Sequence, residues 1–233
     1  MKIFVGTSGW AYGWNIGGDL RWYVESSGLN AVELNASFYR FPFPNQIKGW
    51  AKIGQDLRWS IKVNRLITHV RKFNSFETWK RFFELFSTLD ELVDFYLFQL
   101  PPNITPRMWD KIKKFARATK LHERFALEPR NPEWFKDTKT FEDEEITFVS
   151  VSAPGLPNDI FKTSDAVYLR MHGVDAWYSY CYSFQELSDF AARVAAAKPK
   201  RAYVFFNNDH DMLNNAREMK KIFESNKSRV PHD

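Results

Sequence analysis

The order of apolar and amphipathic segments predicts an α/β fold, a single (β/α)8 barrel of the TIM type. Short apolar runs rich in β-branched and aromatic residues recur eight times, and segments of helical period separate most of them. Most runs are continuously apolar, as expected for parallel strands covered on both faces. The length of 233 residues is close to the usual size of such a barrel, about 250 residues. A doubly wound open sheet is the alternative architecture.

The predicted strands are spread through the whole chain. Between the sixth and seventh, Pro154, Gly155 and Pro157 leave no helical pattern in 152–165. We therefore expect either an extended crossover there or a strand count that is wrong by one. The predicted strands are Lys2–Val5, Ala31–Leu34, Trp59–Val63, Phe95–Leu100, Arg124–Leu127, Ile146–Val151, Ala166–Met171 and Ala202–Phe206.

Capping residues mark the starts of several expected helices. Asn74 with Glu77, and Ser183 with Glu186, have the spacing of capping boxes. Thr105–Pro106 is typical of an N-cap followed by proline at the first helical position. The last helix has its apolar stripe at Met212, Ala216, Met219 and Phe223.

No linker or repeat divides the sequence. We expect one barrel domain over residues 1–224 and a C-terminal tail over 225–233. The single Cys181 can form no internal disulfide. No apolar run approaches the roughly 18 residues that span a bilayer, so we expect a soluble, cytoplasmic protein without a membrane partner. With 33 basic and 28 acidic residues, the net charge of +5 is compatible with an anionic partner.

Nearly every predicted strand ends in a side chain that can ionise or form hydrogen bonds. In a barrel these ends meet on one face, where the active sites of the fold lie. The alternative is that the polar groups satisfy one another, for example through pairing of Arg170 with Glu33 or Glu128. The residues expected at this mouth are Ser8, Trp10, Glu33, Asn35, Tyr39, Lys62, Asn64, His69, Gln99, Glu128, Arg130, Arg170, His172, Asn207, Asn208 and Asp209.

Four of these residues are candidates for the chemistry itself. His172 is the first choice for proton transfer, with Glu33 or Glu128 as its partner, because histidine titrates near neutral pH. A buried Lys62 could act as a base or an imine-forming amine if its pKa is lowered, and could equally be a counter-ion. For His69 a packing or capping role is the alternative.

The sequence favours an anionic substrate, and a phosphate in particular. Arginine and lysine side chains at the mouth match phosphate oxygens. The loops after strands seven and eight often bind phosphate in this fold, and here they contain His172–Gly173 and Asn207–Asp209. The second of these loops opens the last helix, whose N–H groups attract anions, although Asn208 or Asp209 as a simple cap is the alternative. The cationic groups expected at the mouth are Lys62, Arg65, His69, Arg130, Arg170 and His172.

No cofactor is predicted. A divalent metal on Glu33, Glu128, His172 and Asp209 is the alternative, which the nearby lysine and arginines oppose. The aromatic loop Trp177–Tyr182, together with Trp10, Tyr12 and Trp14, either stacks on a sugar or nucleobase or packs on itself as a lid.

The motifs at the strand ends resemble those of the family called domain of unknown function 72. The resemblance covers residues 1 to about 224 and implies a TIM-barrel-like fold, but no settled reaction. The sequence departs from the family pattern at Leu127–Arg130, where an aromatic residue usually separates the glutamate and the arginine, and in a shorter segment between Trp14 and Tyr23. The matching motifs are Gly6–Trp10, Glu33–Asn35, Phe38–Arg40, Lys62–Arg65, Thr68–His69, Phe98–Pro102, Leu169–Gly173 and Phe206–Asp209.

Three functions remain open at this point. The first is a hydrolase or lyase that acts on a phosphate-containing or nucleic-acid-derived substrate, with Arg130, Arg170 and Lys62 stabilising charge. The second is a non-catalytic protein that binds single-stranded nucleic acid. The third is a sugar-directed isomerase or a glycosidase, which would use two carboxylates. No protein partner can be inferred.

Overall fold

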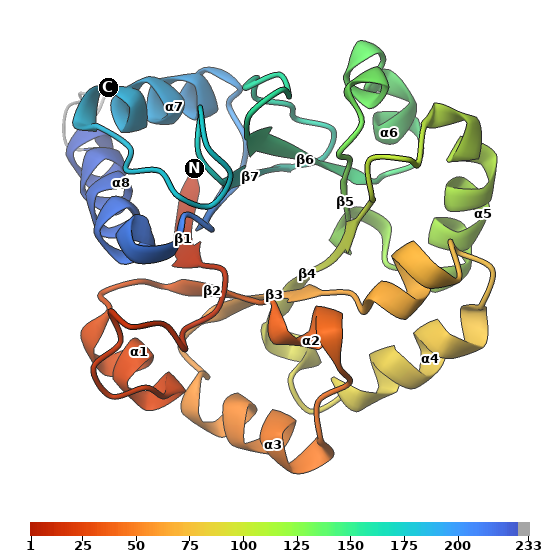
Figure 1. The fold of residues 1–233 in the computed structure, drawn as a ribbon, viewed down its shortest axis with the longest axis horizontal. Helices are drawn as coiled ribbons and strands as arrows, with labels where there is room; N and C mark the ends of the chain where they lie inside the picture. Colours follow the sequence, from red (N-terminus) through yellow and green to blue (C-terminus); the bar gives the residue numbers. More distant parts are fainter. Residues whose placement is uncertain (228–233) are drawn as a thin grey trace.

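The computed structural model describes residues 1–227, in which eight parallel strands close into a barrel (Figure 1). The strands follow one another in chain order, and the last pairs with the first from Lys2–Arg201 to Thr7–Phe206. The predicted barrel is therefore confirmed, and the open sheet is excluded. The strands are β1 (Lys2–Thr7), β2 (Ala31–Leu34), β3 (Arg58–Lys62), β4 (Val93–Gln99), β5 (Phe125–Glu128), β6 (Thr147–Ser152), β7 (Ala166–Met171) and β8 (Arg201–Phe206).

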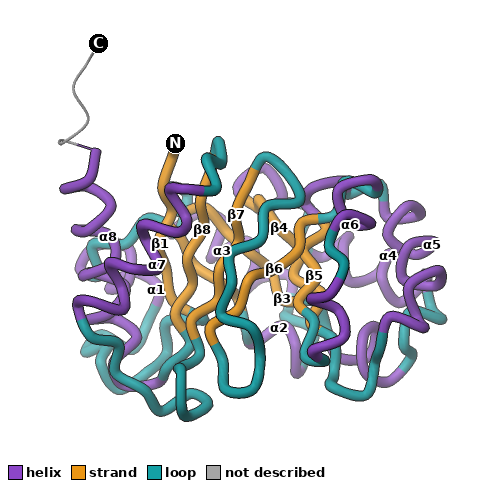
Figure 2. Tube along the Cα trace, turned by 90° about the horizontal axis from the view of Figure 1, so that it is seen from above, coloured by secondary structure: helices purple, strands orange, loops and turns teal. Residues whose placement is uncertain are grey.

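Helices form the outer layer around the strands (Figures 1 and 2). Short helical turns add to them, among them a π-helix at Leu66–Val70 and 3-10 turns at Pro106–Met108, Pro132–Lys136 and Asp209–Asp211. Within residues 1–227, no helix is long and apolar enough to cross a membrane. The helices are α1 (Leu20–Ser26), α2 (Ala36–Tyr39), α3 (Pro44–Ile53), α4 (Phe76–Leu85), α5 (Trp109–Thr119), α6 (Lys139–Asp143), α7 (Phe184–Ala196) and α8 (Met212–Lys227).

The crossover from β6 to β7 is the extended loop that the prolines and glycine predict. No helix forms between Ser152 and Ala166. Instead the ring of Phe161 packs 5.0 Å from that of Phe148 and 5.6 Å from that of Phe135. An aromatic side chain therefore covers this side of the barrel in place of a helix.

One expected helix start is confirmed, whereas two others and the start of the tail need correction. Ser183 and Glu186 form the predicted capping box of α7. Helix α4, however, is capped by Ser75 rather than Asn74, because it is the Ser75 hydroxyl that accepts the Thr78 N–H. Thr105 precedes a 3-10 turn without a side-chain cap bond. Helix α8 continues to Lys227, so 225–227 of the expected tail are helical, and 228–233 lie outside the described residues.

Aromatic side chains fill the interior of the barrel below its polar end. Tyr203 stacks on Phe4 with 4.7 Å between ring centroids and meets Phe95 edge-on at 4.9 Å. Tyr168 lies 5.1 Å from Phe95 and 5.2 Å from Phe205. The interior is thus a packed core that supports the residues at the carboxyl ends of the strands.

Strands β1 and β2 approach closely at a glycine. Gly6 pairs with Ala31, and a Cβ atom on Gly6 would lie 2.2 Å from the Ala31 carbonyl oxygen. Only a residue without a side chain allows this spacing, and β1 and β2 carry Ser8 and Glu33 into the site.

Gly6→Ala should therefore destabilise the protein by about 2 kcal/mol or more, because the backbone of β1 or β2 must move. Gly49→Ala is the matched control, since Gly49 lies in helix α3 with open space at the Cβ position, and it should stabilise by about 0.5–1 kcal/mol. Urea unfolding measures both. Equal effects of the two substitutions would contradict the close approach.

Candidate functional site

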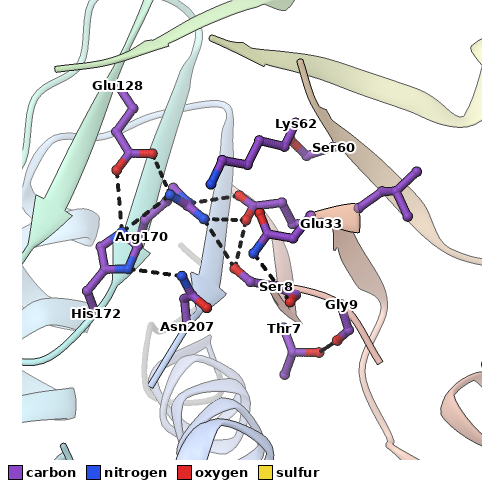
Figure 3. Close-up of polar contacts among 12 residues, drawn as sticks. Thr7, Ser8, Gly9, Glu33, Ser60, Lys62, Glu128, Arg170, His172 and Asn207 are labelled. Carbon is purple, nitrogen blue, oxygen red and sulfur yellow. Dashed lines mark hydrogen bonds and ion pairs between the residues drawn. The ribbon is translucent and has the colours of Figure 1, made fainter. Parts of the chain in front are cut away.

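Arg170 lies at the centre of the polar mouth and binds two carboxylates at once (Figure 3). Its Nε and Nη2 donate to Glu33 at 2.9 and 2.5 Å, and its Nη1 donates to Glu128. All three side chains are fully buried. The residues come from β7, β2 and β5, so closure of the barrel brings them together. The mutual pairing considered for Arg170 in the sequence is realised with both glutamates.

Glu33 is held by neutral hydroxyls as well as by Arg170. Ser8 Oγ donates to Glu33 at 2.7 Å, and the Tyr168 hydroxyl donates at 2.6 Å and also contacts Ser60 at 2.7 Å. Every nitrogen of Arg170 has a partner, and its side chain is out of contact with solvent. Arg170 therefore forms a charged floor of the mouth and has no donor left for a substrate anion, which corrects its expected role as a substrate ligand.

Glu128 is also the anchor of Arg130 and His172. Arg130 Nη2 forms an ion pair with Glu128 Oε1, and His172 Nε2 lies 3.4 Å from the same oxygen. Arg130 Nη2 is 3.1 Å from His172 Nε2, and Asn207 Nδ2 is 3.3 Å from His172 Nδ1. Burial raises the pKa of Glu128, but Arg130 and Arg170 outweigh it and hold that pKa well below its usual range. Glu128 is thus an anion at neutral pH.

His172 is a neutral, enclosed imidazole. Burial, followed by repulsion from Arg130 and Arg170, lowers its pKa well below 6.5. Trp177 and Tyr178 cover the ring, each with its centroid 5.5 Å away, and the side chain is fully buried. His172 does have the predicted carboxylate partner, but neither ring nitrogen reaches the solvent.

The aromatic loop after β7, Trp177–Tyr182, packs on the protein, as expected if it forms a lid. Trp177 also covers the Arg130 guanidinium at 4.5 Å. Tyr182 accepts the Gly173 N–H at 2.7 Å and donates to Ser152 at 2.8 Å. Trp177 and Tyr178 remain 37% and 39% exposed, so their outer edges border the mouth.

Lys62 differs from the other buried charged groups of the mouth, because no carboxylate or carbonyl in residues 1–227 binds its amine. Its side chain, at the end of β3, is only 7% exposed, and Nζ lies 4.4 Å from the centre of the Phe38 ring. Within residues 1–227 its Nζ makes no ion pair or hydrogen bond, and Figure 3 shows the side chain directed toward the Arg170 cluster. Burial and then Arg170 lower its pKa from 10.5 to about 7. A large share of Lys62 is therefore an uncharged amine near neutral pH.

His69 lies on the other side of the same phenylalanine. It belongs to the π-helix after β3, its ring meets Phe38 edge-on at 5.0 Å, and Nδ1 is 2.8 Å from the Thr68 hydroxyl. Burial, followed by repulsion from Lys62 and Arg65, lowers its pKa to about 4. Of the six expected cations, His69 and His172 are thus neutral at pH 7, and Arg170 is fully paired.

Unpartnered amide oxygens lie on the strand ends beside Lys62. Asn35 Oδ1, after β2, and Gln99 Oε1, at the end of β4, are buried without a hydrogen bond to residues 1–227. Both strands pair with β3. Because buried polar atoms in proteins nearly always have partners, these oxygens indicate that a ligand or water completes the mouth.

Other residues predicted for the site have packing or turn-forming contacts, or lie on the exposed rim. Trp10 meets Trp50 and Trp59 edge-on at 5.6 and 5.9 Å. Asn64 donates to the Ser37 carbonyl at 2.8 Å and accepts the Leu66 N–H at 3.0 Å, which shapes the turn after β3. Tyr39 is 68% exposed on the outer rim.

The start of the last helix does not have the character of a phosphate site. Asn208 donates to the Tyr180 carbonyl at 2.7 Å and to Asn215 at 2.8 Å, and makes no side-chain cap. Asp209 and Asp211 place carboxylates in the first turn, where they would repel an incoming anion. The polar side chains at this helix start therefore favour an anion less than the sequence led us to expect.

The metal alternative would use Glu33, Glu128, His172 and Asp209 as ligands. No group of three or more His, Cys, Asp or Glu side chains in residues 1–227 is arranged to hold a metal ion. Glu33 and Glu128 are both bound to Arg170 instead.

A cavity of about 740 Å³ lies at the opposite end of the barrel and includes His122, Glu145 and Asp165. Its charged residues are exposed or paired with one another, as in the His122–Glu145 contact of 2.6 Å. Polar atoms of Asn35, Gln99 and Arg130 are buried without a hydrogen bond at the mouth, and we therefore place the site there.

Sequence reasoning missed Tyr168, Ser60 and Phe38. Tyr168 is two residues before Arg170 on β7, so strand alternation places both side chains inside the barrel. This alternation of side chains along the strand could therefore have identified Tyr168 from the sequence. The contacts of the Phe38 ring with Lys62 and His69 depend on the path of α2, and no pattern in the sequence indicated them.

Arg170→Met should destabilise the protein by about 3–5 kcal/mol, because it leaves two buried carboxylates without their shared cation. Arg117→Met removes an exposed ion pair with Glu144 and should leave the unfolding midpoint almost unchanged. Urea unfolding at pH 7 distinguishes them. A small loss for Arg170→Met, similar to that of the control, would contradict the central role of this arginine.

Lys62→Met should raise stability, and the gain should shrink as the pH rises. The folded pKa near 7 lies below the ordinary value of 10.5, so between these two values the unfolded chain binds more protons, and the native protein with Lys62 becomes more stable with rising pH. The methionine variant lacks this dependence, so its advantage is greatest at pH 7 and below. Melting temperatures from pH 6 to 10 measure it. The exposed Lys80→Met is the control, and parallel curves for all three proteins would contradict the account.

The comparisons with known proteins agree with this fold. The family model described as "Protein of unknown function DUF72" matches residues 4–233. No curated protein matches the chain.

Solved structures extend the same similarity. A DUF72 family protein from Enterococcus faecalis V583 is 21% identical with a TM-score of 0.83, covering 99% of this chain and 97% of its own. A DUF72 family protein from Thermotoga maritima MSB8 is 24% identical with a TM-score of 0.77, and the match covers 96% of this chain and 100% of that protein. D-psicose 3-epimerase from Clostridium cellulolyticum H10, solved with D-tagatose, is 13% identical with a TM-score of 0.55, and the match covers 98% of this chain and 99% of the epimerase.

Proposed function

The chain belongs to the DUF72 family of proteins of unknown function, and we propose that it is an enzyme, a lyase or hydrolase that acts on a small anionic substrate through the amine of Lys62. The observation that carries this proposal is the absence of an acceptor for a nearly buried lysine within residues 1–227. Burial of a lysine without a partner destabilises a protein unless the amine becomes neutral. Such an arrangement is typical of a reacting amine, whereas buried charged groups with a purely structural role are normally paired.

The reacting group is Lys62 rather than His172. A catalytic residue must contact the substrate, and the His172 ring is enclosed by Trp177, Tyr178 and the charged floor. We assign His172 a positioning role: it fixes Glu128 and Arg130 while remaining uncharged. Lys62, by contrast, has its amine at the mouth and carries a lone pair at pH values above about 7.

Arg130 is the group best placed to bind an anion. Within residues 1–227 its Nη2 contacts Glu128 and His172, and its Nε is buried without a partner. The carboxylates of Glu33 and Glu128 are already balanced by Arg170 and Arg130, so Lys62 makes the mouth positive whenever it is protonated. This charge balance favours a substrate with one carboxylate or phosphate group.

A sugar-directed isomerase is the second candidate, and its support is the distant similarity of fold to the psicose epimerase. The glycosidase alternative has less support, because that chemistry needs one protonated carboxyl group. Here the pKa of Glu128 is held well below its usual range by Arg130 and Arg170, in spite of burial.

The test is calorimetric binding of inorganic phosphate and of small phosphate esters and hydroxy acids. Arg130→Met should weaken the binding of the best anion at least tenfold, while Arg107→Met, on the exposed surface, should bind like the wild type. A single-stranded oligonucleotide, titrated at several salt concentrations, tests the nucleic-acid alternative. Tight, steeply salt-dependent oligonucleotide binding without binding of any small anion would contradict the proposal.

A further inference from the structure

We propose that Lys62 forms a covalent imine with its substrate, so that the substrate is a hydroxylated aldehyde or ketone. This inference rests on the proposed function, in which Lys62 is the reacting group. It adds the nature of the bond that forms and the chemical class of the molecule that enters the mouth.

The position of the amine suits addition to a carbonyl carbon. Lysines that serve as counter-ions are held by a carboxylate, but Arg170 occupies both glutamates that face Lys62. The Phe38 ring lies 4.4 Å from Nζ on one side. No other acceptor in residues 1–227 binds the amine. Its lone pair is therefore available to a substrate, and its lowered pKa supports the same conclusion.

The step balances without an additional reagent. The Nζ lone pair adds to the carbonyl carbon, and two protons from the amine pass to the former carbonyl oxygen, which leaves as water. The product is a carbon–nitrogen double bond to Lys62. Once protonated, this bond withdraws electrons from the neighbouring carbon, which stabilises the carbanion that an imine-forming lyase generates there.

The neighbouring amides indicate hydroxyl groups next to the carbonyl. Asn35 Oδ1 and Gln99 Oε1 are buried and unpartnered, and the strands β2 and β4 that carry or precede them flank β3. Substrate hydroxyls would donate to these oxygens. Arg130, two residues after the end of β5, would bind an acidic group at the far end of the same molecule.

The experiment is reductive trapping of the full-length protein with dihydroxyacetone phosphate and sodium cyanoborohydride at pH 7.5. Peptide mapping by mass spectrometry then locates the reduced adduct. We expect Lys62 to be modified at least tenfold faster than any other amine, including the N-terminus. Lys62→Arg should lose this adduct, and the surface variant Lys113→Arg should keep it. Melting curves establish that both variants are folded.

A measurement on the wild-type protein makes the test independent of the variants. The rate of trapping at Lys62 should reach half its maximum near pH 7, while trapping at surface lysines should still be rising at pH 9. An adduct spread evenly over the surface amines, with no preference for Lys62, would overturn the inference. If anion binding still depends on Arg130 in that case, the proposed function stands and only the covalent step is wrong; if anion binding is absent as well, both fail.

Discussion

The double ion pair of Arg170 is the interaction on which the rest of the mouth depends. One guanidinium, fully buried, pairs with carboxylates from β2 and β5 at once. Without this cation, two anions would stand in a medium of low dielectric constant, which is strongly unfavourable. With it, both carboxylates are bound to Arg170. The charge of the neighbouring basic groups then depends on whether another anion is left to pair with them.

The binding of both carboxylates to Arg170 helps to explain why the pKa values of the neighbouring bases are low. His172 and His69 lie next to cations and are shielded from water, so both are neutral at pH 7. Lys62 has no anion left to pair with, so its amine also loses its proton easily. A mouth that is strongly basic in the sequence is therefore less so in the structure, where Lys62 is an amine of lowered pKa and Arg130 is only partly paired.

The sequence was sufficient for the fold, but not for the pairing of charged side chains within the mouth. The apolar runs predicted all eight strands, because parallel strands buried on both faces have few other patterns. The same topology gathered Glu33, Glu128 and Arg170, which lie far apart along the chain. Which charges cancel depends on side-chain directions and on distances of a few ångströms, and no spacing in the sequence encodes these. The helix cap at Ser75 rather than Asn74 is the same kind of detail, decided by one hydrogen bond.

The most direct test is a titration of the Lys62 amine itself, by NMR of ¹³C-labelled lysine side chains with Lys62→Arg to assign the signal. The account predicts that this one resonance titrates with a midpoint near pH 7, clearly separated from the other lysines. A midpoint near the ordinary value of 10.5 would show that Lys62 is a stable cation, and would contradict both the reacting amine and the chemistry built on it.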